Sequence, residues 1–328
     1  MLTVDKVSKH FRLGRKRMLH AVDRVSLEVQ AHEVMGLVGE SGSGKSTLAR
    51  VIVGLLPKTS GEIHFAGEKW PDRLTPKDFQ RLGRQMQMIF QDPFSSLNPR
   101  MTVAELIGEG LRLQEVVRGD AAVRERVAYW LERVGLHPDH ISRYPHEFSG
   151  GQRQRIGIAR ALAVEPRFLV CDEPVSALDV SVQAQIIRLL DELKATLGLS
   201  MLFIAHDLAM VRHVSDRMTV MYLGGIVESG PADLIYFQPC HPYTRLLVAA
   251  NPVPDPVRER QRPRPLARGE IPSPINLGSG CRFATRCPEV MPHCHQVPPR
   301  PVTWADGRIV VCHLDQQTLF QRPWGAAE

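Results

Sequence analysis

The sequence predicts an α/β fold whose core is a parallel sheet covered by helices on both faces. Three short apolar runs carry this prediction, at residues 34–38, 168–171 and 201–205. Each run is flanked by helical or turn sequence, which is typical of strands buried on both faces. Residues 2–29 instead alternate apolar and polar side chains, and they predict an antiparallel β edge beside that core.

Composition is that of an ordinary globular protein of 328 residues, enough for one large domain or two smaller ones. No apolar run approaches the ~18 residues that span a bilayer, and no leader pattern follows Met1. We therefore expect the chain to stay in the cytosol unless another protein holds it at a membrane. The formal net charge of +6 is modest, and the basic cluster at residues 12–17 lacks interleaved aromatic side chains. We expect no nucleic-acid partner.

Helical periodicity predicts a helical subdomain at about residues 92–165, inserted into the α/β core. From residue 252 to residue 274, prolines and charged side chains replace apolar periodicity, which indicates a linker or extended arm. We expect residues 1–250 to form the main domain, with one further helix after the last strands. Residues 251–328 would hold the linker and a small cysteine-containing extension.

A glycine-rich loop follows the first predicted buried strand. Its residues are Gly39, Glu40, Ser41, Gly42, Ser43, Gly44, Lys45, Ser46 and Thr47. The glycines let successive backbone N–H groups point at a polyphosphate. Lys45 supplies a mobile positive charge for the β- and γ-phosphates, and Ser46 can place its hydroxyl on Mg²⁺. Because a strand precedes the loop and helix-like sequence follows it, the pattern predicts a nucleoside triphosphate site.

Two acids, Asp172 and Glu173, directly follow the second predicted buried strand. This is the carboxyl end of the strand, where ligands bind in open α/β sheets. Asp172 can hold Mg²⁺, directly or through water, and Glu173 can polarise a water for in-line attack on a γ-phosphate. Such acids are often only helix caps or turn formers, but the phosphate loop in the same chain favours a catalytic role.

A second anion-binding turn precedes a predicted helix. We call it the signature tetrad, and it consists of Ser149, Gly150, Gly151 and Gln152. Its backbone N–H groups would lie beside the positive end of a helix dipole. In isolation, the same pattern would indicate an ordinary serine N-cap.

Together these motifs resemble those of ATP-binding-cassette (ABC) ATPases over about residues 2–250. The phosphate loop, the signature tetrad and the acid pair occur in the order and spacing of that family. Further matches are Gln91 in I-F-Q-D-P, Asp179 in S-A-L-D and His206 in A-H-D. The signature tetrad is the discriminating element, since other phosphate-loop NTPases lack it. Because the chain departs from none of these positions, the resemblance implies ATP hydrolysis.

The resemblance also implies roles for individual residues. In this family two cassettes dimerise head to tail, and each signature helix caps the ATP held by the other. Gln91 resembles the glutamine that reaches Mg²⁺ and moves with the membrane partner. Asp179 resembles the acid at the dimer interface, and His206 the histidine that contacts the γ-phosphate. Phe11 would stack on adenine or pack as a core aromatic. The implied catalytic residues are Lys45, Gln91, Glu173 and His206, and the implied Mg²⁺ ligands are Ser46, Gln91 and Asp172.

Segments 92–100, 144–148 and 241–245 resemble the dipeptide, oligopeptide and nickel importer ATPases, in particular the second (F-type) ATP-binding subunit of a dipeptide permease. This implies a peripheral subunit on the cytoplasmic face of the inner membrane. It would pair with a second ABC ATPase in a head-to-tail heterodimer, drive two transmembrane permease subunits and serve an extracytoplasmic substrate-binding protein. The cargo stays open between peptides, nickel and another small solute. A soluble ABC ATPase outside transport is the alternative class, and a phosphotransferase would leave the signature tetrad without a role.

Four of the six cysteines lie in the last fifth of the chain, namely Cys281, Cys287, Cys294 and Cys312. A reducing cytosol disfavours disulfides, and four thiolates suit Zn²⁺ or an iron–sulfur cluster. The absence of a C-x-x-C knuckle weakens the zinc alternative. Spacing alone leaves metal binding and free thiols open, and we expect His293, His295 and His313 to face solvent. The resemblance implies a [4Fe–4S] cluster, because some peptide-importer ATPases carry one in this extension.

Overall fold

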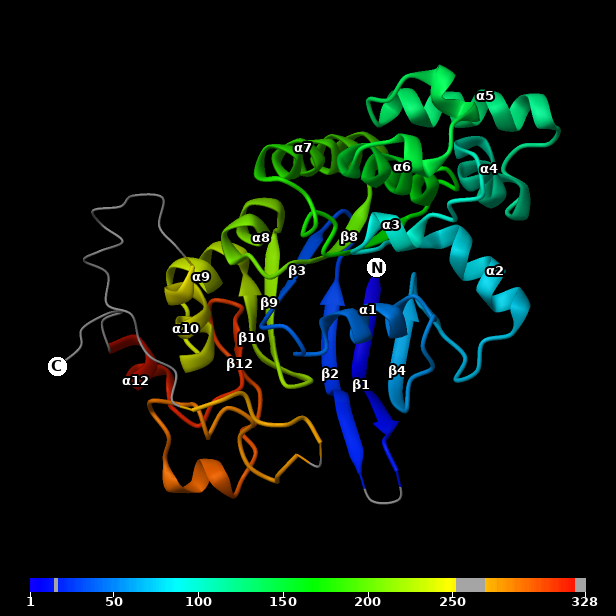
Figure 1. Cartoon of the computed structure of the whole chain (residues 1–328). Coiled ribbons are helices and arrows are strands. Elements are labelled where there is room, and N and C mark those ends of the chain that lie inside the picture. The colour runs from blue at the N-terminus through cyan, green and yellow to red at the C-terminus, as the bar shows by residue number, and fades with distance from the viewer. Residues whose placement is uncertain (15–16, 252–268, 276, 322–328) are drawn as a thin grey trace.

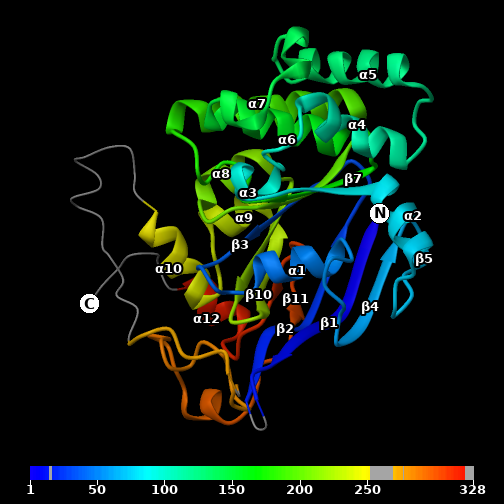
Figure 2. The same ribbon diagram turned by 45° about the vertical axis from the view of Figure 1, so that its right-hand side comes forward.

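The computed structural model describes residues 1–14, 17–251, 269–275 and 277–321. Two β-sheets form its centre, and helices cover the larger sheet (Figure 1). Most of the predicted linker, residues 252–268, lies outside the described residues. We call residues 277–321 the cysteine extension. In Figures 1 and 2 it lies at the opposite end of the molecule from helices α4 and α5.

The smaller sheet is antiparallel and has the strand order β2-β1-β4-β5. Its strands are β1 (Leu2–Arg12), β2 (Met18–Val29), β4 (Ser60–Phe65) and β5 (Glu68–Lys69). Burial alternates along the second half of β2, where Val25, Leu27 and Val29 are buried and their neighbours are exposed. This confirms the antiparallel edge that the alternating sequence predicts.

The larger sheet has the order β11-β12-β10-β9-β3-β8-β7-β6. Its strands are β3 (Val34–Val38), β6 (Met86–Ile89), β7 (Phe168–Asp172), β8 (Ser200–Ile204), β9 (Arg217–Tyr222), β10 (Gly225–Pro231), β11 (Val302–Thr303) and β12 (Ile309–Val310). The five strands from β9 to β6 pair in parallel, and β10, β12 and β11 continue the sheet in antiparallel fashion. The three predicted apolar runs are β3, β7 and β8, and every residue of these strands is buried.

The helices are α1 (Lys45–Ile52), α2 (Pro76–Gln85), α3 (Pro93–Ser96), α4 (Val103–Leu113), α5 (Asp120–Arg133), α6 (Gly150–Leu162), α7 (Val180–Leu197), α8 (Leu208–Val214), α9 (Ala232–Phe237), α10 (Pro242–Ala250) and α12 (Gln316–Gln321), with short 3₁₀ helices η1 (Pro138–Ser142), η2 (Pro145–Glu147) and η3 (Pro292–His295). Two helices, α9 and α10, follow β10 where the sequence predicts one. Pro242 separates them, since proline suits the first turn of a helix but not its interior. None of the described helices has both the length and the apolar character needed to cross a bilayer.

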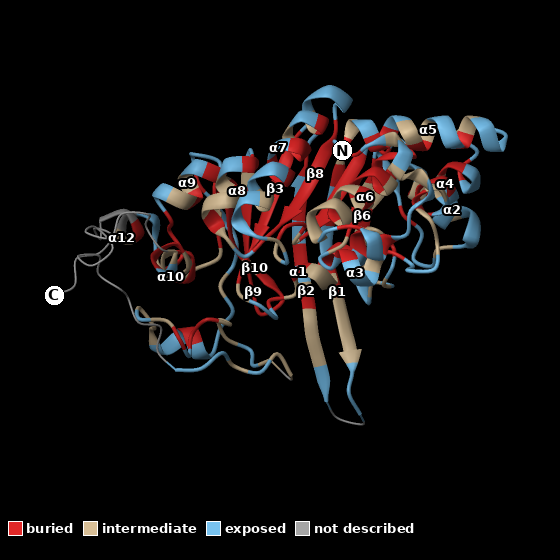
Figure 3. Ribbon diagram, turned by 45° about the horizontal axis from the view of Figure 1, so that its top comes forward, coloured by how far each residue is buried: buried red, intermediate tan, exposed pale blue. Residues whose placement is uncertain are grey.

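The larger sheet divides the hydrophobic core into two parts. Val34 and Val38 pack into the core beneath the helices α4 to α8, whereas Met35 and Leu37 pack toward α1 and the smaller sheet. Figure 3 shows the resulting buried centre, with the exposed surface concentrated on the outer helices. Because β3 is buried on both faces, the loop that follows it starts from a fixed point.

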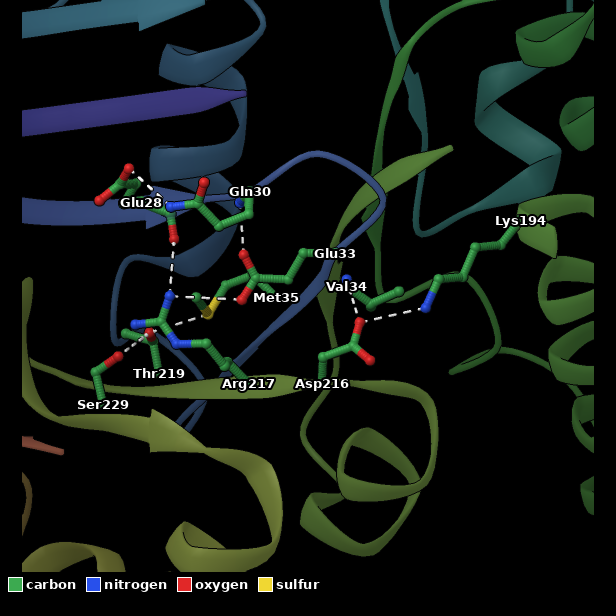
Figure 4. Close-up of polar contacts among 10 residues, drawn as sticks. All are labelled: Glu28, Gln30, Glu33, Val34, Met35, Lys194, Asp216, Arg217, Thr219 and Ser229. Carbon is green, nitrogen blue, oxygen red and sulfur yellow. Dashed lines mark hydrogen bonds and ion pairs between the residues drawn. The ribbon is translucent and has the colours of Figure 1, made fainter. Parts of the chain in front are cut away.

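A polar network ties β3 to its surroundings (Figure 4). The backbone N–H of Val34 donates to Asp216 Oδ2 at 2.7 Å, and Lys194 Nζ of α7 lies 3.2 Å from the same oxygen. On β9, the Thr219 hydroxyl contacts the sulfur of Met35 at 3.4 Å. These contacts fix the start of β3 against both β9 and α7.

Glu228 of β10 is fully buried and anchors the beginning of α10. Its carboxylate accepts hydrogen bonds from the backbone N–H groups of Cys240 and His241, each at 2.9 Å. Burial raises the pKa of this carboxyl group, because an ion is poorly solvated in the core. The side chain therefore joins the sheet to the segment that leads into the last helices.

We expect Glu228→Ala to lower the free energy of unfolding by about 2–4 kcal/mol, because it leaves two buried N–H donors without an acceptor. Urea unfolding followed by circular dichroism measures this change. Glu125→Ala, on the exposed face of α5, is the matched control and should change stability by less than about 0.5 kcal/mol. Equal stability of the two variants would contradict the anchoring role.

Candidate functional site

The phosphate loop turns sharply between β3 and α1. Gly39 has φ +152°, and a Cβ there would lie 2.1 Å from the Met221 carbonyl oxygen. Gly44 has φ +103°, and a Cβ there would lie 2.1 Å from the Ala21 carbonyl oxygen. Both positions thus require glycine, for backbone conformation and for space. The loop ends at Lys45, the first residue of α1, so that the N-terminus of this helix faces the loop.

Lys45 is buried, and its side chain folds back over the loop. Its Nζ donates to the carbonyl oxygens of Gly39, at 2.8 Å, and Glu40, at 3.0 Å. Burial lowers the pKa of Lys45, while the nearby carboxylates of Glu173 and Asp172 act in the opposite direction. An ammonium group held by neutral carbonyl groups is available to a more strongly charged partner, such as a phosphate oxygen.

Ser46 and Asp172 provide two oxygen ligands side by side. The Ser46 hydroxyl donates to Asp172 Oδ1 at 2.8 Å, which joins the start of α1 to the end of β7. Burial raises the pKa of Asp172 despite this hydrogen bond. A divalent cation would supply the missing counter-charge, and hydroxyl and carboxylate oxygens are the ligands that Mg²⁺ prefers. The donor set therefore fits Mg²⁺.

Glu173 lies at the centre of the predicted catalytic residues. Its Oε2 accepts a hydrogen bond from Gln91 Nε2 at 2.8 Å and lies 3.9 Å from His206 Nδ1. The residue has φ +47°, unusual for a side chain with a Cβ, and its N–H donates to the Ile204 carbonyl oxygen at 2.9 Å. Strained backbone of this kind is concentrated at functional sites, where surrounding structure holds it in place.

The structure thus brings together the six residues predicted for phosphate, Mg²⁺ and water, which are Lys45, Ser46, Gln91, Asp172, Glu173 and His206. They lie at or after the C-terminal ends of four neighbouring parallel strands, β3, β6, β7 and β8, at the same edge of the sheet. The arrangement can bind a triphosphate with Mg²⁺ and position a water beside a carboxylate.

The signature tetrad lies at the start of α6. Ser149 and Gln152 hydrogen-bond each other in a reciprocal cap, at 3.0 and 3.3 Å. A Cβ on Gly151 would lie 2.5 Å from a methyl carbon of Val182, so this glycine permits close packing against α7. Asp179 caps α7 beside this contact and is exposed. The tetrad and Asp179 therefore lie side by side, with Ser149 and Asp179 exposed and the other three residues half-buried.

Phe11 lies near the end of β1 and is half-buried, with Lys9 Nζ 4.9 Å from its ring centre. It is not part of either hydrophobic core among the described residues. A half-buried aromatic ring outside these cores is compatible with stacking on a base.

Sequence analysis missed two side chains that hold the phosphate loop. The Tyr243 hydroxyl accepts a hydrogen bond from the Glu40 backbone N–H at 2.9 Å. Arg286 binds the Glu40 carboxylate through two hydrogen bonds of 2.7 and 3.0 Å. Residues 243 and 286 are more than 200 positions away from the loop, and no local pattern marks them as part of it.

The four cysteines of the extension line one small cavity, together with His313. Burial raises the pKa of Cys287 to about 12 and that of Cys312 to about 11, so both are protonated thiols near neutral pH without a metal. His295 is exposed, as expected, but His313 is half-buried, and its ligand atom lies within 4.8 Å of those of His293 and Cys294. Sulfur and imidazole groups converge here in a form that fits a metal centre.

Fold and site together define a phosphate-loop ATPase, and comparisons identify its family. Residues 22–176 match the family model described as "ABC transporter". Residues 227–294 match the family model described as "Oligopeptide/dipeptide transporter, C-terminal region". The putative oligopeptide transport ATP-binding protein YkfD of Bacillus subtilis is 52% identical over 96% of this chain and 95% of its own length. The oligopeptide transport ATP-binding protein OppF of Escherichia coli is 53% identical over 86% of this chain and 84% of its own length.

Two solved structures agree with this identification. The ATP-binding cassette MJ0796, in a dimeric post-hydrolysis state bound to ADP and Pi, has a TM-score of 0.65 and 27% identity, and it matches 71% of this chain and 99% of its own. CbiO1 from Clostridium perfringens, part of the ABC transporter complex CbiONQ, has a TM-score of 0.63 and 27% identity, and the match covers 72% of this chain and 90% of CbiO1. The chain belongs to the ABC ATPases of the oligopeptide/dipeptide transporter family. The resemblance, the fold class and the expected ATPase activity are thereby confirmed.

We expect Lys45→Ala to raise the Kd for a fluorescent ATP analogue at least ~10-fold, since it removes the buried ammonium group that is predicted to bind the phosphates. Equilibrium fluorescence titration measures the Kd. Lys77→Ala, on exposed α2, is the control and should bind as the wild type does. Unchanged affinity in Lys45→Ala would place the triphosphate elsewhere.

Proposed function

We propose that this chain is the ATP-hydrolysing energy-coupling subunit of an importer for dipeptides or oligopeptides. The observation that carries the proposal is the convergence of the phosphate loop, the Ser46–Asp172 pair and Glu173, in a chain whose C-terminal region matches the oligopeptide/dipeptide transporter family. Import of nickel or another small solute by the same architecture is the alternative, because cargo is selected outside the ATPase. A soluble ABC ATPase outside transport is disfavoured by the same C-terminal match.

Each residue of the site has a definite task in this proposal. Residues 39–47 bind the phosphates, and Mg²⁺ would be held by Ser46 and Asp172, with Gln91 within reach. When bound, Mg²⁺ neutralises charge that develops on the phosphates. Glu173 orients and polarises the attacking water, and His206 contacts the γ-phosphate. Phe11 stacks on adenine.

A second ABC ATPase completes the site. The signature tetrad lies beside the exposed Asp179, and its reciprocal cap uses the N–H groups of Ser149 and Gln152, so those of Gly150 and Gly151 could face an anion. Val180, beside Asp179, is 82% exposed, which suits a surface that another subunit covers. We propose a head-to-tail pair, formed with a related but different ATPase, in which each tetrad caps the ATP of the other subunit.

Separate membrane subunits would dock at the groove between α2 and α4. This groove contains Gln91 and Asp172, and it is lined by the exposed apolar side chains Phe79 and Leu113. A partner seated there touches Gln91, which bonds the catalytic carboxylate of Glu173. Two transmembrane permease subunits and an extracytoplasmic substrate-binding protein complete the proposed assembly, with this chain peripheral on the cytoplasmic face of the inner membrane.

We also propose the boundaries of two units. Residues 1–250 form the ABC ATPase domain, with the helical subdomain at about residues 92–165. Residues 251–328 comprise the proline-rich linker and the extension with four cysteines. Helices α4, α5 and α6 contact one another, which supports grouping them as one helical subdomain.

We expect Glu173→Gln to leave ATP affinity within about twofold of wild type while lowering turnover at least ~100-fold, because the amide cannot act as a base for the attacking water. Phosphate release and analogue binding are measured on the same preparation. Glu192→Gln, exposed on α7, controls for the loss of one carboxylate. Hydrolysis at the wild-type rate would remove Glu173 from the catalytic role.

For the cysteine extension, we propose a [4Fe–4S] cluster held by Cys281, Cys287, Cys294 and Cys312. Four thiolates around one zinc at ~2.3 Å would require sulfur atoms about 3.8 Å apart. In the described chain, the sets of three ligand atoms within 4.8 Å of one another are His293–Cys294–His313 and His10–His20–Asp23, and neither contains two cysteines. Among the described residues, no three of the four sulfurs form such a set, and the proposal rests on the four cysteines lining one cavity, with Zn²⁺ as the alternative.

We expect Cys281→Ser to lower the iron content of anaerobically purified protein by more than half, because one of four ligands is lost. Elemental analysis and the visible absorption of the cluster measure the loss. His295→Ala and His313→Ala should keep their iron. Wild-type protein with one bound zinc and no iron, or zinc loss in His313→Ala, would establish the alternative.

A further inference from the structure

An ion pair joins the cysteine extension to the phosphate loop. Arg286 Nη1 lies 2.7 Å from Glu40 Oε2, and Nη2 lies 3.0 Å from Oε1, so the two planar groups meet in parallel. Arg286 is only 8% exposed, and the Glu40 side chain is 28% exposed. Two-point bonding of a guanidinium group to a carboxylate fixes orientation as well as charge.

The position of Arg286 is set by the turn between two of the cysteines. The N–H of Ala284 donates to the carbonyl oxygen of Cys281 at 3.1 Å, and the N–H of Arg286 donates to that of Phe283 at 3.0 Å. Phe283 is buried edge-on against Tyr222, with ring centres 5.3 Å apart. The next residue after Arg286 is Cys287. Whatever holds these two cysteines in place therefore also holds the guanidinium group.

Glu40 is the residue of the loop whose side chain could oppose nucleotide binding. Its carbonyl oxygen accepts a hydrogen bond from Lys45 Nζ, so its backbone directly supports the lysine that faces the phosphates. An unpaired carboxylate at this position would repel the negative charge of a triphosphate. The ion pair with Arg286 neutralises that carboxylate and directs it toward the extension.

We propose that Arg286 is a positioning residue for the nucleotide site, through which the fold of the cysteine extension controls nucleotide affinity. This inference rests on the proposed nucleotide site. It assigns the extension a mechanical link to ATP binding, formed by one arginine between Cys281 and Cys287. The link acts on affinity, since it sets the charge and the backbone of the loop before any nucleotide arrives.

The test is equilibrium binding of a fluorescent ATP analogue to the full chain. We expect Arg286→Ala to raise the Kd about tenfold, and Arg286→Lys, which keeps the charge but not the two-point geometry, to raise it less. Combining Arg286→Ala with Glu40→Gln should recover most of the affinity, because the unpaired carboxylate is gone. Arg118→Ala, which removes an exposed ion pair with Glu115, is the control and should not change the Kd.

The outcomes separate this inference from the proposed function. Failure of the wild type to bind the analogue would overturn the nucleotide site itself. Wild-type binding with an unchanged Kd in both Arg286 variants would overturn only the role of Arg286. A double variant as weak as Arg286→Ala would overturn the charge argument. Should Arg286→Ala not fold, the Kd of Arg286→Lys decides alone, because an unchanged Kd in that variant would overturn the role of Arg286.

The connection to the cysteines is tested by a second pair of variants. We expect Cys287→Ser to raise the Kd in the wild-type background but to add little in the Arg286→Ala background, since both changes act through the same contact. An equal increase in both backgrounds, or none in either, would overturn the role of the extension.

Discussion

The site depends on one constraint of the parallel sheet, which is that its strands end at the same edge. β3 leads into the phosphate loop, β6 into Gln91, β7 into the acid pair and β8 into His206. Side chains that are far apart in the chain therefore meet within hydrogen-bond distance. The apolar cores on both faces hold these strands in register, and the polar network around Asp216 holds the start of β3.

Much of this arrangement could be predicted from the sequence, because strands buried on both faces of a parallel sheet consist of short apolar runs. Residues 34–38 and 168–171 are of this kind, and the motifs directly after them could be assigned to one edge of the sheet. The shorter strands could not be foreseen. β6 has four residues, and β11 and β12 have two each, too few to show a period. These strands exist because neighbouring strands offer them partners.

Contacts between distant segments were also beyond the sequence. Arg286 and Glu40 are 246 positions apart, and nothing in the composition of the extension identifies Arg286 among its other arginines. The close packing of Gly151 against Val182 is another example, because the glycine alone also suits a flexible lead-in to a helix. In both cases the residue could have several structural roles, and contacts with distant segments decide which one it has.

The arrangement of the site is tested most directly by a cryo-electron microscopy structure of the assembled complex with Mg²⁺ and a non-hydrolysable ATP analogue. We expect the triphosphate on residues 39–47, with Mg²⁺ beside Ser46 and Asp172, the γ-phosphate beside Glu173 and His206, and the signature tetrad of another subunit across from it. A triphosphate bound away from the carboxyl ends of β3 and β7, or a tetrad remote from every nucleotide, would contradict this arrangement.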